Sequence, residues 1–290
     1  MDSITVTAPA KINLMLDVTG RRPDGYHTLN TIMQSISLAD TVYLSLNGSG
    51  TLTLECNDMS VPLSENNIAY NACEAFYLYS KKYFAGMHIK IVKNIPLQAG
   101  LGGGSADCAA VLVGLNKLLG TNYSNDELCR IGAKLGADVP FCIVGGTKLC
   151  RGIGEDISYI PPLESCFIVI AKGKSGISTK EAYHKIDSLE PRSAANISLY
   201  NGSIDSVKEI GRNIFEEVSN CADVLAVKKI LLQHGAEYTA MSGSGSAVFG
   251  LFGLSGQKNS AHICAERLRA EGFFSDVCIP LSYGAKYFDR

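Results

Sequence analysis

The sequence lacks the paired cysteines that mark disulfide-rich domains and zinc sites. Its 10 cysteines are spread singly along 290 residues, and no Cys-x-x-Cys spacing occurs. Single cysteines in apolar surroundings are typically small buried thiols. We therefore expect neither disulfides nor zinc bound by these cysteines.

Long apolar segments and long basic segments are missing as well. No run of about 18 uncharged apolar residues is present, as a membrane-spanning helix requires, and the first residues lack the basic and apolar regions of a secretory signal. The formal net charge is only −2 and no long basic block occurs, which disfavours nucleic acid as a partner. The expectation is a soluble cytoplasmic protein that contacts neither nucleic acid nor membrane.

Internal repeats and low-complexity segments are also absent, and 46% hydrophobic against 19% charged residues is typical of a folded chain. Strand-like and helix-like patterns alternate, which predicts an α+β fold. At a prior of about 150 residues per domain, two domains are expected. Adjacent prolines at 161 and 162 interrupt regular structure, so we predict domains at residues 1–160 and 161–290. Helices in the second domain are expected at Ile204–Val218, Val224–His234 and Ser260–Glu271.

The densest glycine cluster is the stretch PLQAGLGGGSA at residues 96–106. It lies between an expected strand at His88–Lys93 and an expected helix at Ala106–Leu119. Glycine permits backbone conformations closed to other residues, and free N–H groups at a helix N-terminus attract anions. The sequence has neither the Gly-Lys-Ser/Thr of a Walker loop nor the last glycine of the dinucleotide fingerprint. A phosphate-binding loop of another kind is therefore predicted, with a flexible helix entry as the alternative. The residues expected at the phosphates are Pro96, Leu97, Gln98, Ala99, Gly100, Leu101, Gly102, Gly103, Gly104, Ser105 and Ala106.

Two further positions suggest a cation and a base for phosphoryl transfer. Residues 4–16 are expected to form a strand, whose period of two places Lys11 beside Asn13 on one face. The other face is expected to carry Ile12, Leu14 and Leu16. Asp138, in the turn Gly-Ala-Asp-Val-Pro, is the candidate base. The alternatives for these two residues are a solvated lysine and a turn or capping aspartate.

Five motifs occur together in the order and spacing of one protein family. They are PAKINL at 9–14, RPDGYH at 22–27, PLQAGLGGGSAD at 96–107, GADVP at 136–140 and SGSGS at 242–246. With these motifs the chain resembles the GHMP kinases from about residue 5 to about residue 255. The resemblance implies the two-domain α+β GHMP kinase fold. Its N-terminal domain is like ribosomal protein S5 domain 2, its C-terminal domain is ferredoxin-like, and ATP and substrate meet between them.

The resemblance also implies roles for individual residues. Lys11 and Asp138 match the catalytic pair, and the stretch from Pro96 matches the ATP-phosphate loop. ATP is the expected phosphate donor, with Mg²⁺ carried on its phosphates. Ala106 stands where a second serine is common in the family, which leaves one serine hydroxyl, that of Ser105, to contact phosphate or magnesium.

The substrate implied by the resemblance is a small molecule with a cytidine diphosphate group. Asn13, Tyr26 and His27 match residues that handle its cytidine end, and Tyr26 offers an aromatic face for the base. Tyr183 is the expected aromatic cover from the second domain, with a plain helix-face tyrosine as the alternative. A second small-residue loop is expected to approach the phosphates, with an ordinary hairpin turn as the alternative; its residues are Ser242, Gly243, Ser244 and Gly245.

Three functions are compatible with these motifs. The first is an ATP-dependent kinase for a cytidylyl substrate. The second is a related kinase for another small alcohol such as homoserine or mevalonate, in which the aromatic residue of the Gly-Tyr-His triplet has no base to bind. The third is a nucleotide-sensing module, which has no need of both Lys11 and Asp138.

Overall fold

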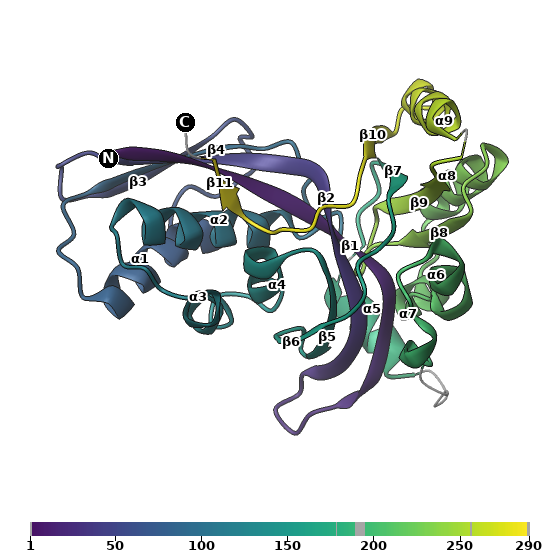
Figure 1. Cartoon of the computed structure of the whole chain (residues 1–290), viewed down its shortest axis with the longest axis horizontal. Coiled ribbons are helices and arrows are strands. Elements are labelled where there is room, and N and C mark those ends of the chain that lie inside the picture. The colour runs from purple at the N-terminus through teal and green to yellow at the C-terminus, as the bar shows by residue number, and fades with distance from the viewer. Residues whose placement is uncertain (1, 178, 189–194, 256, 289–290) are drawn as a thin grey trace.

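The computed structural model describes residues 2–177, 179–188, 195–255 and 257–288, and within them the chain forms a larger mixed sheet and a smaller antiparallel sheet, both covered by helices (Figure 1). The α+β class predicted from the sequence is confirmed. The larger sheet has the order β11-β1-β2-β4-β3. In addition, β5 pairs with the N-terminal part of β2, and β6 pairs with β5. The smaller sheet has the order β10-β7-β9-β8.

The larger sheet is built on a long antiparallel hairpin. Its strands are β1 (Ser3–Arg21), β2 (His27–Leu46), β3 (Leu52–Cys56), β4 (Met87–Val92), β5 (Thr147–Gly152), β6 (Asp156–Tyr159) and β11 (Lys286–Tyr287). Its helices are α1 (Ile68–Ser80), α2 (Gly103–Leu118), α3 (Asn125–Gly132) and α4 (Val139–Val144). Helix α2 packs on β1 and β2, and α1 packs on α2.

The predicted alternation along β1 holds at its start and fails farther on. Lys11 and Asn13 share a face, as expected, because Lys11 donates a hydrogen bond to the Asn13 side chain. The register of β1 against β2 then shifts between Asn13 and Met15. Such a bulge moves the following side chains to the opposite face. The prediction that Leu16 shares a face with Ile12 is therefore wrong: Leu16 belongs to a different core cluster from Ile12 and lines a cavity with Lys11.

The second half of the chain forms the smaller sheet and its helices. Its strands are β7 (Cys166–Lys172), β8 (Tyr238–Met241), β9 (Val248–Gly253) and β10 (Phe274–Cys278). Its helices are α5 (Thr179–Ile186), the short 3₁₀ helix Ile197–Leu199, α6 (Ile204–Ile210), α7 (Ile214–Val218), α8 (Ala222–Gln233) and α9 (Lys258–Ala270). The single helix expected at Ile204–Val218 is wrong. The chain leaves the helix at Gly211, and the side chain of Asn213 caps a new one by accepting from the N–H of Phe215.

The two halves of the chain are joined by a common hydrophobic core and by the C-terminal strand. One hydrophobic core lies under the larger sheet and continues onto one face of β7 and β9, including Ile168, Ile170 and Leu251. After β10, the chain returns to the larger sheet and adds β11 beside β1, so both ends of the chain lie at the same side of the molecule (Figure 1). The domain boundary at 160/161 stays a prediction. None of the helices in the described ranges is both long and apolar enough to span a membrane.

Candidate functional site

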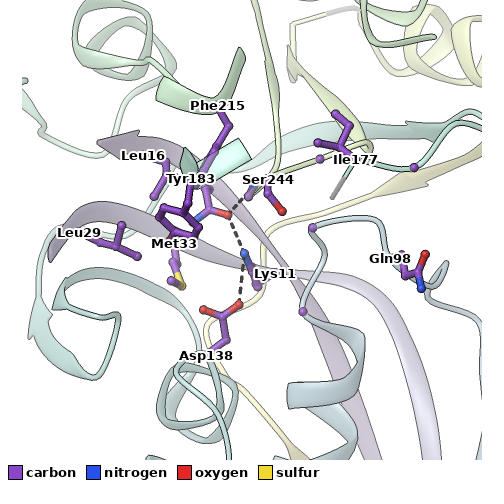
Figure 2. Close-up of a pocket in the computed structure, with 16 residues that line it drawn as sticks. Lys11, Leu16, Leu29, Met33, Gln98, Asp138, Ile177, Tyr183, Phe215 and Ser244 are labelled. Atoms are coloured by element: carbon purple, nitrogen blue, oxygen red, sulfur yellow. Dashed lines mark hydrogen bonds and ion pairs between the residues drawn. The ribbon is translucent and has the colours of Figure 1, made fainter. Parts of the chain in front are cut away.

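Lys11 lies at the centre of the site, buried on β1 with only 4% of its surface exposed. Its Nζ donates to Asn13 Oδ1 at 2.7 Å and lies 3.4 Å from Asp138 Oδ2 (Figure 2). The Asn13 amide is itself oriented, because its Nδ2 donates to Thr31 Oγ1 at 2.9 Å. The alternative of a solvated lysine is wrong, since a buried ammonium is held here by a carboxylate and an amide oxygen.

Asp138 occupies the N-cap position of α4, and Pro140 stands in the first turn of that helix. The Asp138 side chain makes no capping hydrogen bond. Its carboxylate instead points at Lys11 and remains 30% exposed to the cavity side. Of the alternatives, a capping side chain is therefore wrong, whereas Asp138 does lie in a turn. Its carboxylate is accessible to a hydroxyl group beside an ammonium.

The predicted phosphate loop lies directly against Lys11. Gly100 and Gly102 adopt positive φ angles of 74° and 71°. A side chain on Gly102 would meet the Lys11 side chain at 2.9 Å, and one on Gly100 would meet the backbone oxygen of Ser242 at 2.0 Å. Helix α2 begins at Gly103, three residues earlier than predicted, so Gly103, Gly104 and Ser105 form its first turn. The N–H groups of a first turn have no carbonyl partner in a preceding turn, so they are suited to bind a phosphate.

A buried charge cluster holds the base of this loop. Lys93 Nζ donates to Asp107 Oδ2 at 2.8 Å and to Asp40. Asp40 Oδ1 also accepts from the N–H groups of Asn94 and Ile95, at 2.6 and 2.8 Å. Burial raises the pKa of the Asp107 carboxyl to about 8. The chain that enters the glycine loop is thus tied to β2 on one side and to α2 on the other.

The second small-residue loop joins β8 to β9 and contacts the first loop. Ser242 Oγ donates to the backbone oxygen of Gly100 at 2.9 Å, and the N–H of Gly243 donates to Asn13 Oδ1 at 2.9 Å. Asn213 Nδ2 donates to the backbone oxygens of Met241 and Gly243, at 2.6 and 2.8 Å. The loop is a hairpin connection, and it is also fixed against Asn13, which accepts a hydrogen bond from Lys11.

These elements surround a cavity of about 700 Å³ (Figure 2). Of the predicted residues, it is lined by Lys11, Asn13, Gln98, Gly100, Gly102, Asp138, Tyr183, Gly243, Ser244 and Gly245. Sequence reasoning missed an apolar part of its wall, formed by Leu16, Leu29, Met33, Ile177 and Phe215. No local motif marks these residues, because they come from four separate segments that only the tertiary fold brings together.

A second cavity, of about 390 Å³, adjoins the first and is lined by Tyr26, His27 and Tyr183. Tyr183 lines both cavities. Its ring stacks on His27 with centroids 4.6 Å apart and meets the Phe215 ring edge to face at 4.9 Å. Burial raises the pKa of its phenol to about 12. Tyr26 stands in the turn between β1 and β2 and is 62% exposed.

Known proteins match this chain along most of its length. Residues 67–146 match the family model for the GHMP kinases N terminal domain, and residues 197–272 match that for GHMP kinases C terminal. A 4-diphosphocytidyl-2-C-methyl-D-erythritol kinase of Clostridium tetani is 40% identical over 285 residues, which cover 92% of this chain and 96% of that protein.

Solved structures agree with these matches. The crystal structure of a 4-(cytidine 5'-diphospho)-2C-methyl-D-erythritol kinase superposes with a TM-score of 0.79 and 29% identity, covering 96% of this chain and 99% of the other. A homoserine kinase from Cytophaga hutchinsonii has a TM-score of 0.77 at 23% identity, with 99% and 98% of the two chains covered. At that identity the second likeness concerns the fold alone.

Proposed function

Because the chain belongs to the GHMP kinase family, we propose that it transfers the γ-phosphoryl group of ATP to the 2-hydroxyl of 4-diphosphocytidyl-2-C-methyl-D-erythritol, a step in isoprenoid precursor synthesis. The observation that carries this proposal is the pair of adjoining cavities that share Tyr183. One contains a lysine–carboxylate pair suited to phosphoryl transfer, and the other contains the aromatic residues suited to a base.

In this proposal, Asp138 accepts the proton of the attacking hydroxyl while the substrate oxygen forms its bond to the γ-phosphorus. The bond between the γ-phosphorus and the oxygen that bridges to the β-phosphate breaks, and ADP leaves. Lys11 neutralises charge on the phosphoryl group in transit and holds the Asp138 carboxylate in place, 3.4 Å away. Phosphoryl transfer depends mainly on positioning and electrostatics, and these two residues supply both.

The phosphates of ATP are assigned to the N-terminal turn of α2 and the glycine loop before it. Mg²⁺ enters with ATP, and Ser105 is the residue proposed to contact it or a phosphate oxygen. Within the described residues the Ser105 hydroxyl, half-buried in the first turn of α2, has no hydrogen-bond partner. Ser244 and its neighbours in the second loop face the same cavity.

The cytidine end is assigned to the smaller cavity. Tyr26 is proposed to stack on the cytosine, with Tyr183 as the wall between the base and the reacting hydroxyl. Stacking of a base on an aromatic side chain contributes roughly 1–3 kcal/mol. Neither homoserine nor mevalonate has an aromatic base that would fill this cavity. The presence of the cavity therefore favours the cytidylyl substrate.

The test is a coupled assay of ADP release by the purified protein with three acceptors: the cytidylyl substrate, homoserine and mevalonate. We expect turnover with the cytidylyl substrate alone, and ³¹P NMR of the product should place the new phosphate on the 2-hydroxyl. Preferential turnover of homoserine or mevalonate would assign the chain to another kinase of the same fold. Absence of turnover with all three, alongside retained ATP binding, would favour a nucleotide sensor.

A further inference from the structure

His27 is held from two directions by residues of the second half of the chain. Its ring lies parallel to that of Tyr183, with an interplanar angle of 19°. Its Nε2 lies 2.6 Å from Asp187 Oδ1. The side chain is only 10% exposed, and within the described ranges its second nitrogen, Nδ1, has no hydrogen-bond partner. The ring lines the smaller cavity, and one of its two nitrogens is not used by the described part of the protein.

The partner of Nε2 decides the chemistry of Nδ1. The hydrogen bond from His27 lowers the pKa of Asp187, so its carboxylate is ionised at neutral pH and can only accept. Nε2 must then carry the hydrogen, and in the neutral imidazole Nδ1 is left with a lone pair. A ligand atom that faces Nδ1 must therefore be a hydrogen-bond donor.

Asp187 is well placed to impose this state. It directly follows α5, which also carries Tyr183, and its N–H donates to the Tyr183 backbone oxygen at 3.1 Å. Its second oxygen, Oδ2, lies 3.4 Å from Arg21 Nη1. One end of α5 thus supplies both the ring that stacks on His27 and the carboxylate that orients it.

We propose that Asp187 is a positioning residue that fixes the tautomer of His27 and thereby makes the smaller cavity select cytosine over uracil. The inference rests on the assignment of the cytidine end to this cavity. Cytosine carries a 4-amino group, a donor, where uracil carries a carbonyl oxygen, an acceptor. With a lone pair at Nδ1, the amino group is bound and the carbonyl oxygen is repelled.

Calorimetric binding of CDP and UDP tests the proposal without requiring catalysis. We expect the wild-type protein to bind CDP more tightly than UDP, and Asp187→Ala to reduce that preference roughly tenfold, the usual effect of one misplaced hydrogen bond. Asp187→Asn should have an intermediate effect, because an amide can accept from or donate to Nε2 and so permits either tautomer. Asp205→Asn, at a side chain that is 85% exposed, is the matched control and should keep the wild-type preference.

A double-mutant cycle separates action through His27 from direct or structural effects. In a His27→Ala background, Asp187→Ala should change the CDP-to-UDP preference no further, whereas an additive loss would contradict the proposal. In steady-state kinetics, Asp187→Ala should raise KM for the cytidylyl substrate while kcat and KM for ATP stay near wild type. Equal CDP and UDP binding by the wild-type protein would also overturn the proposal.

The two failures are distinguishable. A wild-type protein that prefers CDP to UDP but does not phosphorylate the cytidylyl substrate would remove the proposed function and leave the role of Asp187 standing. If instead the wild-type protein turns over the substrate and Asp187→Ala does not change the CDP-to-UDP preference, the proposed function stands and the role of Asp187 is removed. Thermal unfolding of each variant, expected to match the wild type, checks that the changes are not due to loss of structure.

Discussion

At the scale of single residues, the site depends on a carboxylate that serves no structural purpose in its own helix. Asp138 stands at the N-cap of α4 without capping it, and its ionic partner is Lys11. The geometry leaves one carboxylate edge for a substrate hydroxyl, which is the arrangement that a general base needs.

We predict that Asp138→Asn lowers kcat by roughly 10²–10⁴, the usual contribution of a general base. The amide keeps the size of the side chain but cannot accept the hydroxyl proton, so ATP binding should be largely retained. Steady-state kinetics together with nucleotide titration measures both effects. Asp156→Asn, on exposed β6, is the control, and a kcat equal to wild type in Asp138→Asn would reduce Asp138 to a turn residue.

A second residue-scale prediction concerns stability. Lys148 on β5 is 8% exposed; its Nζ donates to the Thr147 backbone oxygen at 3.3 Å and lies 4.7 Å from the centre of the Tyr159 ring. No carboxylate in the described part of the chain forms an ion pair with it, and burial lowers its pKa. The charged form is therefore less stable in the folded protein than in the unfolded chain.

Lys148→Met keeps the apolar stem and removes this charge, so we predict an increase in the free energy of unfolding. The gain should be present at neutral pH and vanish as the pH rises through the ordinary lysine pKa, where the wild-type side chain is neutral in both states. Urea denaturation measures it. Lys229→Met, at an exposed lysine of α8, should change the unfolding free energy little, and a loss in Lys148→Met would mean that the ammonium stabilises the fold.

At the scale of elements, the Asp40–Lys93–Asp107 cluster links the glycine loop to the sheet and makes that link depend on pH. Because the folded-state pKa of Asp107 is raised from 3.8 to about 8, the folded protein holds a proton that the unfolded chain releases. The resulting stability is complete below the unfolded pKa and is lost as the pH rises through the folded one.

Asp107→Asn carries a permanently neutral group at this position. We predict that the unfolding free energy of the variant, relative to wild type, increases from pH 5 to pH 9. Urea denaturation at several pH values measures the difference, with Asp126→Asn at the exposed start of α3 as the control. A difference that does not change with pH would show that Asp107 keeps its charge throughout.

Several elements were predictable from the sequence, since local chemistry decides them. The period of two correctly placed Lys11 beside Asn13. The helices expected at Val224–His234 and Ser260–Glu271 are α8 and α9, with each end within two residues of the prediction. The errors have equally physical origins. The bulge after Asn13 depends on pairing with β2, a segment distant in sequence, and it moved Leu16 to a face that a uniform alternation cannot anticipate.

The residues of the site also fall into those that a local motif predicts and those that only tertiary contacts bring in. Residues in glycine-rich or turn motifs carried recognisable signals, and the structure brings Lys11, Asp138 and both loops together. Phe215 and Asp187 carried none, because each occurs in ordinary polar sequence and gains its role only through contacts with Tyr183 and His27. Tertiary contacts, rather than local pattern, made these residues part of the site.

At the scale of the whole molecule, the C-terminal segment supports the helix that presents Asp138. The N–H of Ala285 donates to the backbone oxygen of Cys142 in α4 at 2.7 Å. A side chain on Gly284 would meet that same oxygen at 2.2 Å. The last part of the chain therefore fits against α4 only while residue 284 has no side chain.

We predict that Gly284→Ala lowers the free energy of unfolding by about 1–3 kcal/mol, the usual cost of overpacking, and lowers kcat because α4 must shift. Differential scanning calorimetry and steady-state assays measure the two effects. Ser282→Ala, at an exposed neighbour, should leave both unchanged. A Gly284→Ala variant with wild-type stability would show that the C-terminal segment can move away from α4 freely.

The long hairpin of β1 and β2 has one more consequence. Lys11 lies in the middle of β1, His27 begins β2, and the pairing of the two strands fixes the path between them. In the proposed function, the distance from Lys11 to the cavity for the cytidine end is thus set by a single piece of sheet. We therefore expect an analogue of the proposed substrate that is shortened by one phosphate to occupy either cavity but not both at once.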